Sequence, residues 1–177
     1  MTEPLMTAPP MTDPLTLRPL RVGDAGAMSR VLADVALYTF TGGQPPTSQE
    51  LARRYAVQTQ GYAPDGSARW VNSVVLLGAE REPIGYVQAT VPVSGQPTEI
   101  AWVIGTPWQG RGYARRAVTL LLAALAAEGV GQVIAHIHPQ NRASVRLATR
   151  LGFQATDIVI DGETRWRASI APLHRVP

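Results

Sequence analysis

A short glycine-containing segment, QGRGYA at residues 109–114, is the feature that most constrains what this chain can fold into. It stands between a predicted strand over residues 99–104 and a predicted helix that begins at about Tyr113. Glycines let a backbone approach an anion closely. The first turn of a helix offers unpaired N–H groups and a partial positive charge. A strand, a glycine loop and a helix in this order predict a phosphate-binding site.

Arginines flank the start of this helix. Arg111, Arg115 and Arg116 place positive charge at the helix end where the helix dipole disfavours it, which makes sense if phosphates bind there. The alternative is an ordinary strand–helix loop with solvated arginines. Two other phosphate loops are excluded, because the chain has no G-x-x-x-x-G-K-[ST] motif and no G-x-G-x-x-G after its first predicted strand.

Apolar periodicity predicts the elements around this loop. We expect strands over residues 15–20, 70–77, 84–91, 99–104, 133–138, 153–160 and 163–170. We expect helices over residues 24–37, 47–60, 113–127 and 141–151. Thr47 and Glu50 form a T-x-x-E capping box, Asp24 is a candidate helix cap, and Asp161-Gly162 is a hairpin turn signal. This order predicts a mixed α/β sheet with helices on both faces.

Composition narrows the class of protein. The chain has 177 residues, of which 45% are hydrophobic, and a formal net charge of +3 without an arginine-rich block, so nucleic-acid and membrane partners are not expected. The absence of cysteine excludes disulfides, thiolate metal sites and cysteine nucleophiles. No apolar stretch reaches the roughly 18 residues that span a bilayer, and the first residues do not resemble a signal peptide. We therefore expect a cytoplasmic protein with one domain over residues 15–171 and tails at residues 1–14 and 172–177.

The motifs, taken as an ordered set, resemble those of the GNAT N-acetyltransferase superfamily. QGRGYA matches the family pattern Q/R-x-x-G-x-G/A, and NRASVRLATRLGF at residues 141–153 is similar to the second cofactor-side motif, N-x-x-S…L-G-F. LTLRPLRVGDAGAM and the strand EIAWVI are similar to the Rim-type branch, which includes ribosomal-protein N-terminal acetyltransferases. The resemblance implies a mixed, mostly antiparallel sheet of six to seven strands, about four helices and a V-shaped splay between the fourth and fifth strands.

The resemblance also implies where acetyl-CoA would bind, without a metal. The cofactor would lie in the splay, where the backbone of Val103 and Ile104 would pair with the pantetheine arm and Asn141 would hydrogen-bond to that arm. Main-chain N–H groups of the loop would hold the pyrophosphate, and these belong to Gln109, Gly110, Arg111, Gly112, Tyr113 and Ala114. Three arginines form one stripe on the last helix: Arg142, Arg146 and Arg150. This stripe would face either the adenosine phosphates, with Arg146 as the predicted contact, or solvent.

The reaction that the resemblance implies is direct attack of an amine on the thioester. Alkyl ammonium groups titrate near pH 10, so a base is needed, and Glu99 is the predicted base, directly or through a water. The alternative is a strand-end glutamate that binds the acceptor's cation. Ser144 is the predicted proton donor to the CoA thiolate, although Asn141 and Ser144 could equally be only the N-cap and a first-turn residue. The tyrosine that many family members use as the acid is missing from its usual place.

Two histidines and three aromatic residues complete the candidate site. His136 and His138 lie two apart on a strand and share one face. They lack a third ligand, so no metal site is predicted. The pair could line the cleft, with His138 as a second-choice base, but satisfied structural histidines are the favoured interpretation. Three aromatic side chains could line the acceptor side of the cleft, although a role in the core is the default interpretation: Tyr38, Phe40 and Trp70.

The sequence therefore predicts an N-acetyltransferase that moves acetyl from acetyl-CoA to a primary amine, with a peptide α-amine as the first candidate. A small amine such as an antibiotic or a polyamine is the alternative acceptor, although the 13 acidic residues are scattered, which argues against a polycation. A non-catalytic acyl-CoA-binding module is the alternative of another class, and the presence of Glu99 argues against it. A DNA-binding regulator is disfavoured because no helix-turn-helix is evident. A homodimer is left open.

Overall fold

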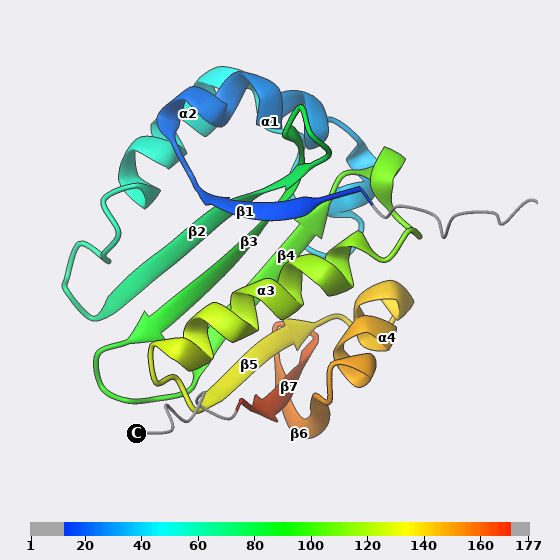
Figure 1. The fold of residues 1–177 in the computed structure, drawn as a ribbon. Helices are drawn as coiled ribbons and strands as arrows, with labels where there is room; N and C mark the ends of the chain where they lie inside the picture. Colours follow the sequence, from blue (N-terminus) through cyan, green and yellow to red (C-terminus); the bar gives the residue numbers. More distant parts are fainter. Residues whose placement is uncertain (1–12, 171–177) are drawn as a thin grey trace, which may run out of the picture.

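The computed structural model describes residues 13–170, which form a seven-stranded sheet with helices on both faces (Figure 1). The strands run in the order β1-β2-β3-β4-β5-β7-β6. Their bounds are β1 Leu15–Pro19, β2 Ala68–Leu77, β3 Glu82–Pro92, β4 Thr98–Ile104, β5 Gln132–Ile137, β6 Gln154–Ile160 and β7 Glu163–Ser169. The helices are α1 Ala25–Val31, α2 Ser48–Gln58, α3 Tyr113–Ala127 and α4 Arg142–Arg150. Apart from residues 13 and 14, the predicted tails lie outside the described residues.

Alternating side chains of the central strands supply two hydrophobic layers. In β2, Val75 and Leu77 belong to the layer beneath α3, whereas Val74 and Leu76 belong to the layer beneath α1 and α2. A strand that is buried on both faces needs apolar residues at nearly every position, and β2 ends in such a run. On α3, the buried residues follow the predicted helical spacing: Ala117, Val118, Leu121, Leu125 and Ala126. Among the described residues, no helix is both long enough and apolar enough to cross a membrane.

The fourth and fifth strands run parallel and separate after two residue pairs. Thr98 pairs with Val133 and Glu99 pairs with Ile134, whereas β4 itself continues to Ile104. Beyond that point β5 stays paired with β7. The predicted V-shaped splay is therefore present. Because α3 follows β4 and α4 follows β5, both helices begin at the open end of the splay (Figure 1).

One predicted helix is shorter than expected. The pattern predicts a helix over residues 24–37, but α1 ends at Val31 and a separate 3₁₀ turn follows at Val35–Tyr38. Asp34 causes the break, because its backbone is extended (φ −77°, ψ 120°) and its side chain accepts a hydrogen bond from the Ala36 N–H at 2.9 Å. An aspartate that caps a new turn ends the preceding one, so the segment leading to Tyr38 turns back over the sheet.

Two other local predictions are confirmed and one is not. The Thr47 side chain and the Glu50 carboxylate form the reciprocal capping box at the start of α2. Asp161 and Gly162 both have positive φ, 51° and 82°, as the tight turn between β6 and β7 requires. Asp24 does not cap α1 through its side chain, since its carboxylate closes the turn just before that helix and pairs with an arginine of β1.

Candidate active site

The loop between β4 and α3 presents backbone donors at the open end of the splay. Gly110 and Gly112 have φ values of 74° and 80°, which cost other residues about 1–2 kcal/mol. Gly112 is the N-cap of α3 and supplies no side-chain cap, so first-turn N–H groups are left for a ligand. The Gln109 side chain donates through Nε2 to the Ile104 carbonyl at 2.8 Å, which ties the loop to the end of β4. The loop therefore fits an anion such as pyrophosphate.

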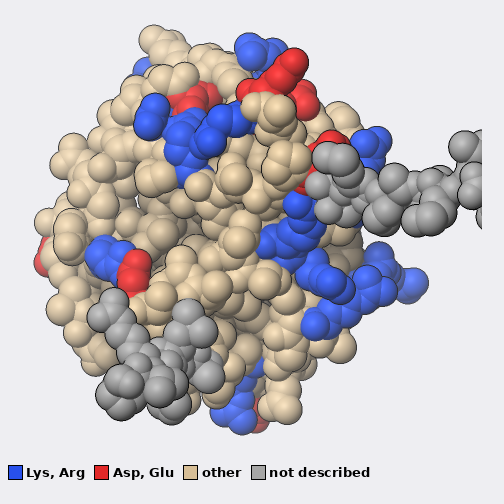
Figure 2. Space-filling model, in the orientation of Figure 1, with Lys and Arg blue, Asp and Glu red and all other residues tan. Residues whose placement is uncertain are grey.

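Positive charge gathers around the two helix starts. Figure 2 shows basic side chains on the side of the molecule where α3 and α4 begin. Exposed arginines of the loop and of these helices are Arg111, Arg115, Arg142, Arg146 and Arg150. Arg116 is engaged within the protein, since it donates to the Asp13 carbonyl at 2.8 Å and its guanidinium lies 5.9 Å from the Tyr113 ring centroid. The remaining arginines suit a polyphosphate ligand.

The two residues predicted to pair with pantetheine lie in the part of β4 that β5 has left. The Ile104 carbonyl accepts the Gln109 side chain described above. The Val103 carbonyl is turned toward β3, where a Cβ added to Gly85 would come within 2.2 Å of it. The Val103 side chain lines a pocket on the α1/α2 face of the sheet. Their contacts with pantetheine stay a prediction.

At the start of α4 the N-cap interpretation of Asn141 is confirmed. Its Oδ1 atom accepts a hydrogen bond from the Ser144 backbone N–H at 3.1 Å. Ser144 lies half-buried in the first turn. Because the cap uses the amide oxygen of Asn141 and the backbone of Ser144, the Asn141 NH₂ group and the Ser144 hydroxyl stay compatible with the predicted cofactor contacts.

Glu99 lies at the point where β4 and β5 separate, and it belongs to a three-residue cluster. Its Oε1 atom is 3.0 Å from Nδ1 of His136. Nε of Arg165 donates to Nε2 of the same ring at 3.2 Å. An arginine can only donate, so Nε2 carries the lone pair and the ring proton sits on Nδ1, where it points at Glu99. The Glu99 side chain is 52% exposed and the His136 side chain 15%. An accessible carboxylate is thus held by a largely buried partner.

His138 does not join this cluster. Its ring stacks on Phe40, with the ring centroids 5.3 Å apart, and its Nδ1 atom accepts from the Gln140 N–H at 3.2 Å. Phe40 comes from the segment between α1 and α2, so the stack connects that segment to the end of β5. Within residues 13–170, no three side chains of His, Cys, Asp or Glu are grouped so as to hold a metal ion.

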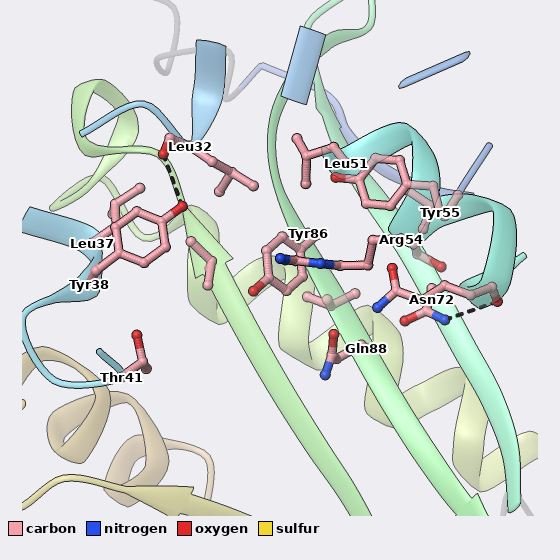
Figure 3. A pocket seen from close by; sticks show the side chains of 15 residues that line it. Leu32, Leu37, Tyr38, Thr41, Leu51, Arg54, Tyr55, Asn72, Tyr86 and Gln88 are labelled. Carbon is pink, nitrogen blue, oxygen red and sulfur yellow. Dashed lines mark hydrogen bonds between the residues drawn. The ribbon is translucent and has the colours of Figure 1, made fainter. Parts of the chain in front are cut away.

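A pocket of about 170 Å³ opens on the α1/α2 face of the sheet, beside Val103 (Figure 3). Its polar lining comes from the 3₁₀ turn at Val35–Tyr38 and from α2, β2 and β3, and it includes Tyr38, Arg54, Tyr55, Asn72, Tyr86 and Gln88. None of the described lining residues is Asp or Glu. Burial raises the pKa of Tyr55 to about 12 and also raises the pKa values of Tyr38 and Tyr86. The tyrosines are therefore neutral at physiological pH, and arginine is the charged residue of this lining.

Among the residues that line this pocket, Tyr38 was predicted from the sequence as a candidate for the acceptor side, and most of the other lining residues were not predicted. Trp70, which was also predicted, is absent from the lining. A signal for the missed residues exists, because Asn72 and Gln88 interrupt otherwise apolar strands and are cross-strand partners of one another. Polar residues facing each other on an inner sheet face indicate a site. Arg54 had no comparable signal, because solvated arginines are common on helices.

Both a protein-family model and solved structures match this chain. A family model described as an acetyltransferase (GNAT) domain matches residues 14–154. An acetyltransferase from Agrobacterium tumefaciens is 25% identical over 95% of this chain and 99% of its own, with a TM-score of 0.68.

Two further structures are similar in fold at lower identity. A spermidine N-acetyltransferase from Vibrio cholerae, solved with CoA and spermine, is 21% identical over 89% of this chain and 96% of its own, with a TM-score of 0.69. An aminoglycoside acetyltransferase, solved with coenzyme A, is 20% identical over 88% and 95%, with a TM-score of 0.71. These neighbours do not single out the Rim-type branch. No curated protein matches the chain.

Proposed function

This chain belongs to the acetyltransferase (GNAT) domain family, and from that premise we propose that it acetylates the α-amine of a peptide. Membership makes it an acyl-CoA-dependent N-acetyltransferase with acetyl-CoA as the donor. The peptide acceptor is the finer proposal, and it is supported by the resemblance of two segments to the Rim-type branch: the first strand and the strand that carries Glu99. The observation that carries the catalytic assignment is Glu99, held by His136 at the point where the splay opens.

Acetyl-CoA supplies a thioester carbonyl that an amine can attack. The residues that would hold its pyrophosphate are the uncapped start of α3 and the loop before it, whose two positive-φ glycines leave room for an anion. Asn141 would contact the pantetheine arm, and Arg146 would contact the adenosine phosphates. This arrangement leaves the α1/α2 face of β4 to the acceptor.

Proton movements in the proposed reaction involve two side chains. Glu99 takes a proton from the acceptor ammonium, directly or through a water, so that the nitrogen lone pair can attack the carbonyl carbon. The new C–N bond forms, the C–S bond breaks, and the CoA thiolate leaves. Ser144 donates its hydroxyl proton to that sulfur and takes up, directly or through a water, the second proton that the nitrogen loses as the amide forms. His136 keeps its own proton on Nδ1 and orients the carboxylate.

The pocket on the α1/α2 face beside Val103, here called the acceptor pocket, favours a peptide over a polycation as the acceptor. The spermidine and aminoglycoside enzymes in the comparison act on molecules with several positive charges. A site for such an acceptor calls for carboxylates, and the described lining of this pocket has none but includes Arg54. A single α-amine, deprotonated for attack, does not need several carboxylates.

The experiment that tests this function measures thiol release with N-terminal peptides and small amines side by side. Calorimetry should first show acetyl-CoA binding in the micromolar range typical of metabolite sites. We expect peptides to be acetylated and spermidine and aminoglycosides to be turned over far more slowly. Faster turnover of the polycations would overturn the peptide assignment, and binding of acetyl-CoA without turnover of any amine would indicate a non-catalytic acyl-CoA module.

A further inference from the structure

Arg54 lies at the mouth of the acceptor pocket and extends into it. It is on the second turn of α2, next to the buried Tyr55. Figure 3 shows its side chain extending from α2 across the pocket toward Tyr86, with Asn72 nearby. Arg54 is an exposed residue that also lines the pocket, so it is accessible to a molecule that enters from solvent.

Arg54 forms no ion pair with the described residues around it, although its charge helps to lower the pKa of the Glu50 carboxyl. Within residues 13–170 the ion pairs are Arg18–Asp24, Arg69–Glu128 and His136–Glu99, and none involves Arg54. Glu50, one helical turn earlier, is committed elsewhere, since its Oε2 atom accepts from the Thr47 N–H at 2.7 Å and from the Thr47 hydroxyl at 2.8 Å. These bonds lower the pKa of the Glu50 carboxyl.

The remaining polar groups of the pocket complement an anion. Gln88 carries an amide NH₂ donor, and Asn72 keeps one NH₂ hydrogen besides the one it donates to the Gln58 carbonyl at 3.4 Å. The Tyr38 hydroxyl already donates to the Leu32 carbonyl at 3.0 Å. Burial raises the pKa of Tyr55 to about 12 and also raises that of Tyr86, so these two phenols stay protonated and can donate a hydrogen bond. A pocket with a guanidinium, amide donors and phenols offers a carboxylate both charge and hydrogen bonds, and arginine binds carboxylates in a bidentate geometry.

We propose that the acceptor amine carries a carboxylate close to its nitrogen and that Arg54 binds this carboxylate. This inference rests on the proposed acetyltransferase function and names the acceptor's chemistry. The pocket, at about 170 Å³, is smaller than the roughly 300–1,000 Å³ of sites for larger ligands. Val103 and Arg54 both line it, so an amine beside β4 and a carboxylate on Arg54 would share this one small pocket. An amino acid's own α-carboxylate and an acidic first side chain of a peptide both fit.

The kinetic test compares acceptors that differ only in charge. One arm uses peptides that begin with Asp or Glu against the same peptides beginning with Asn or Gln. The other arm uses free amino acids against their α-amides, so the two arms separate the two sources of the carboxylate. In the arm that contains the true class of acceptor, we expect kcat/KM to be about tenfold higher for the anionic member of each pair. This is the size of effect typical of a charge-assisted hydrogen bond. Equal values in both arms would overturn the inference.

Variants of neighbouring arginines assign the effect to one side chain. Arg54→Gln should bring the anionic acceptors down to the level of their neutral counterparts, and Arg54→Glu should reverse the preference. Arg53→Gln is the matched control, because Arg53 is the preceding residue, is exposed and does not line the pocket. Both positions are exposed on α2, so thermal unfolding midpoints should stay near that of the parent. A preference that survives in Arg54→Gln would overturn the role of Arg54.

A binding measurement separates this inference from the proposed function. Acetylated products, N-acetyl-glutamyl and N-acetyl-glutaminyl peptides and the corresponding N-acetyl amino acids, are titrated into the full chain in the presence of CoA. Tighter binding of the anionic product, lost in Arg54→Gln, supports the inference even if no amine is turned over, in which case only the proposed function fails. Turnover without any charge preference overturns the inference and leaves the proposed function in place. If neither turnover nor preferential binding is observed, both the inference and the proposed function are overturned.

Discussion

The Nδ1 atom of His136 lies 3.0 Å from Oε1 of Glu99 at the point where β4 and β5 separate. Three strands meet in this contact, because β4 carries Glu99, β5 carries His136, and β7 carries the arginine that bonds the other ring nitrogen. The arginine fixes the tautomer of the ring, and the ring fixes the direction of the carboxylate. Glu99 is thereby oriented while its exposed side remains free for a water or an amine.

Replacing Glu99 tests its assignment as the base. We expect Glu99→Gln to lower kcat by about 10²–10⁴-fold, the usual contribution of a general base, with little change in the Kd of acetyl-CoA. Glutamine can still accept the hydrogen bond from His136, so the local structure should persist. Thiol-release kinetics and calorimetry measure the two quantities. Glu128→Gln, in a glutamate that pairs with Arg69 at the far end of α3, should behave like the parent, and unchanged turnover in Glu99→Gln would remove Glu99 as the base.

Arg165 is predicted to be a positioning residue that acts through His136. Without the Arg165 donor, the imidazole proton is no longer confined to Nδ1, and the carboxylate loses its fixed orientation. We expect Arg165→Met to lower kcat about tenfold and to change the pH profile of kcat, with the KM for acetyl-CoA unchanged. Arg165→Lys, which keeps a donor, should recover part of the rate.

Arg167 provides the control for this prediction. It lies on the same face of β7 as Arg165 but pairs with Ile134 in the strand register, whereas Arg165 pairs with His136 and donates to its ring. Arg167→Met should therefore leave both the rate and its pH profile as they are. A loss of rate that is equal in the two methionine variants, or a loss without any change in the pH profile, would show a general structural effect rather than positioning.

The two histidines show where inference from sequence stops. Their spacing predicts one shared face, as expected for a strand, yet they have separate partners. The physical reason is that β5 ends at Ile137, so His138 has left the strand and stacks on Phe40 instead. The contact between His136 and Glu99 joins residues 37 positions apart, and the sequence alone carries no local signal for their distance.

Local signals, by contrast, were sufficient for most of the scaffold. Apolar periodicity predicts a helix over residues 113–127, which are the observed bounds of α3, and the glycine loop lies between β4 and α3 as predicted. The pocket residues depend on how α2 lies against the sheet, which is set by packing over long sequence separations. Arg54 could therefore be found only once the helix was placed beside β3.

The capping box of α2 predicts a dependence of stability on pH. Hydrogen bonds from the Thr47 backbone and side chain lower the pKa of the Glu50 carboxyl below its ordinary value. A carboxyl with a lowered folded-state pKa stabilises the fold above its unfolded pKa of about 4.3, and that contribution is lost as the pH falls through the folded value. We expect Glu50→Gln to be less stable than the parent at pH 7, with the difference shrinking toward pH 3. Urea unfolding midpoints measure this, and a difference that is the same at both pH values would contradict it.

Gly112 allows backbone strain to be separated from cofactor binding. A side chain at φ 80° is strained by about 1–2 kcal/mol, and relief of that strain would rotate the first N–H groups of α3 away from their positions. We expect Gly112→Ala to lower the free energy of unfolding by about that amount and to raise the Kd of acetyl-CoA about tenfold.

Gly129, at the other end of α3, is the matched control for that substitution. Its φ is 88°, and a Cβ added at either glycine meets no atom within 4 Å, so the two alanine variants carry similar backbone strain and create no clash. They should therefore lose similar unfolding free energy, measured by chemical denaturation. Only Gly112→Ala should weaken acetyl-CoA, because only that glycine starts the helix whose N–H groups are predicted to bind the pyrophosphate. Equal loss of affinity in both variants would mean that destabilisation, rather than the loop, controls binding.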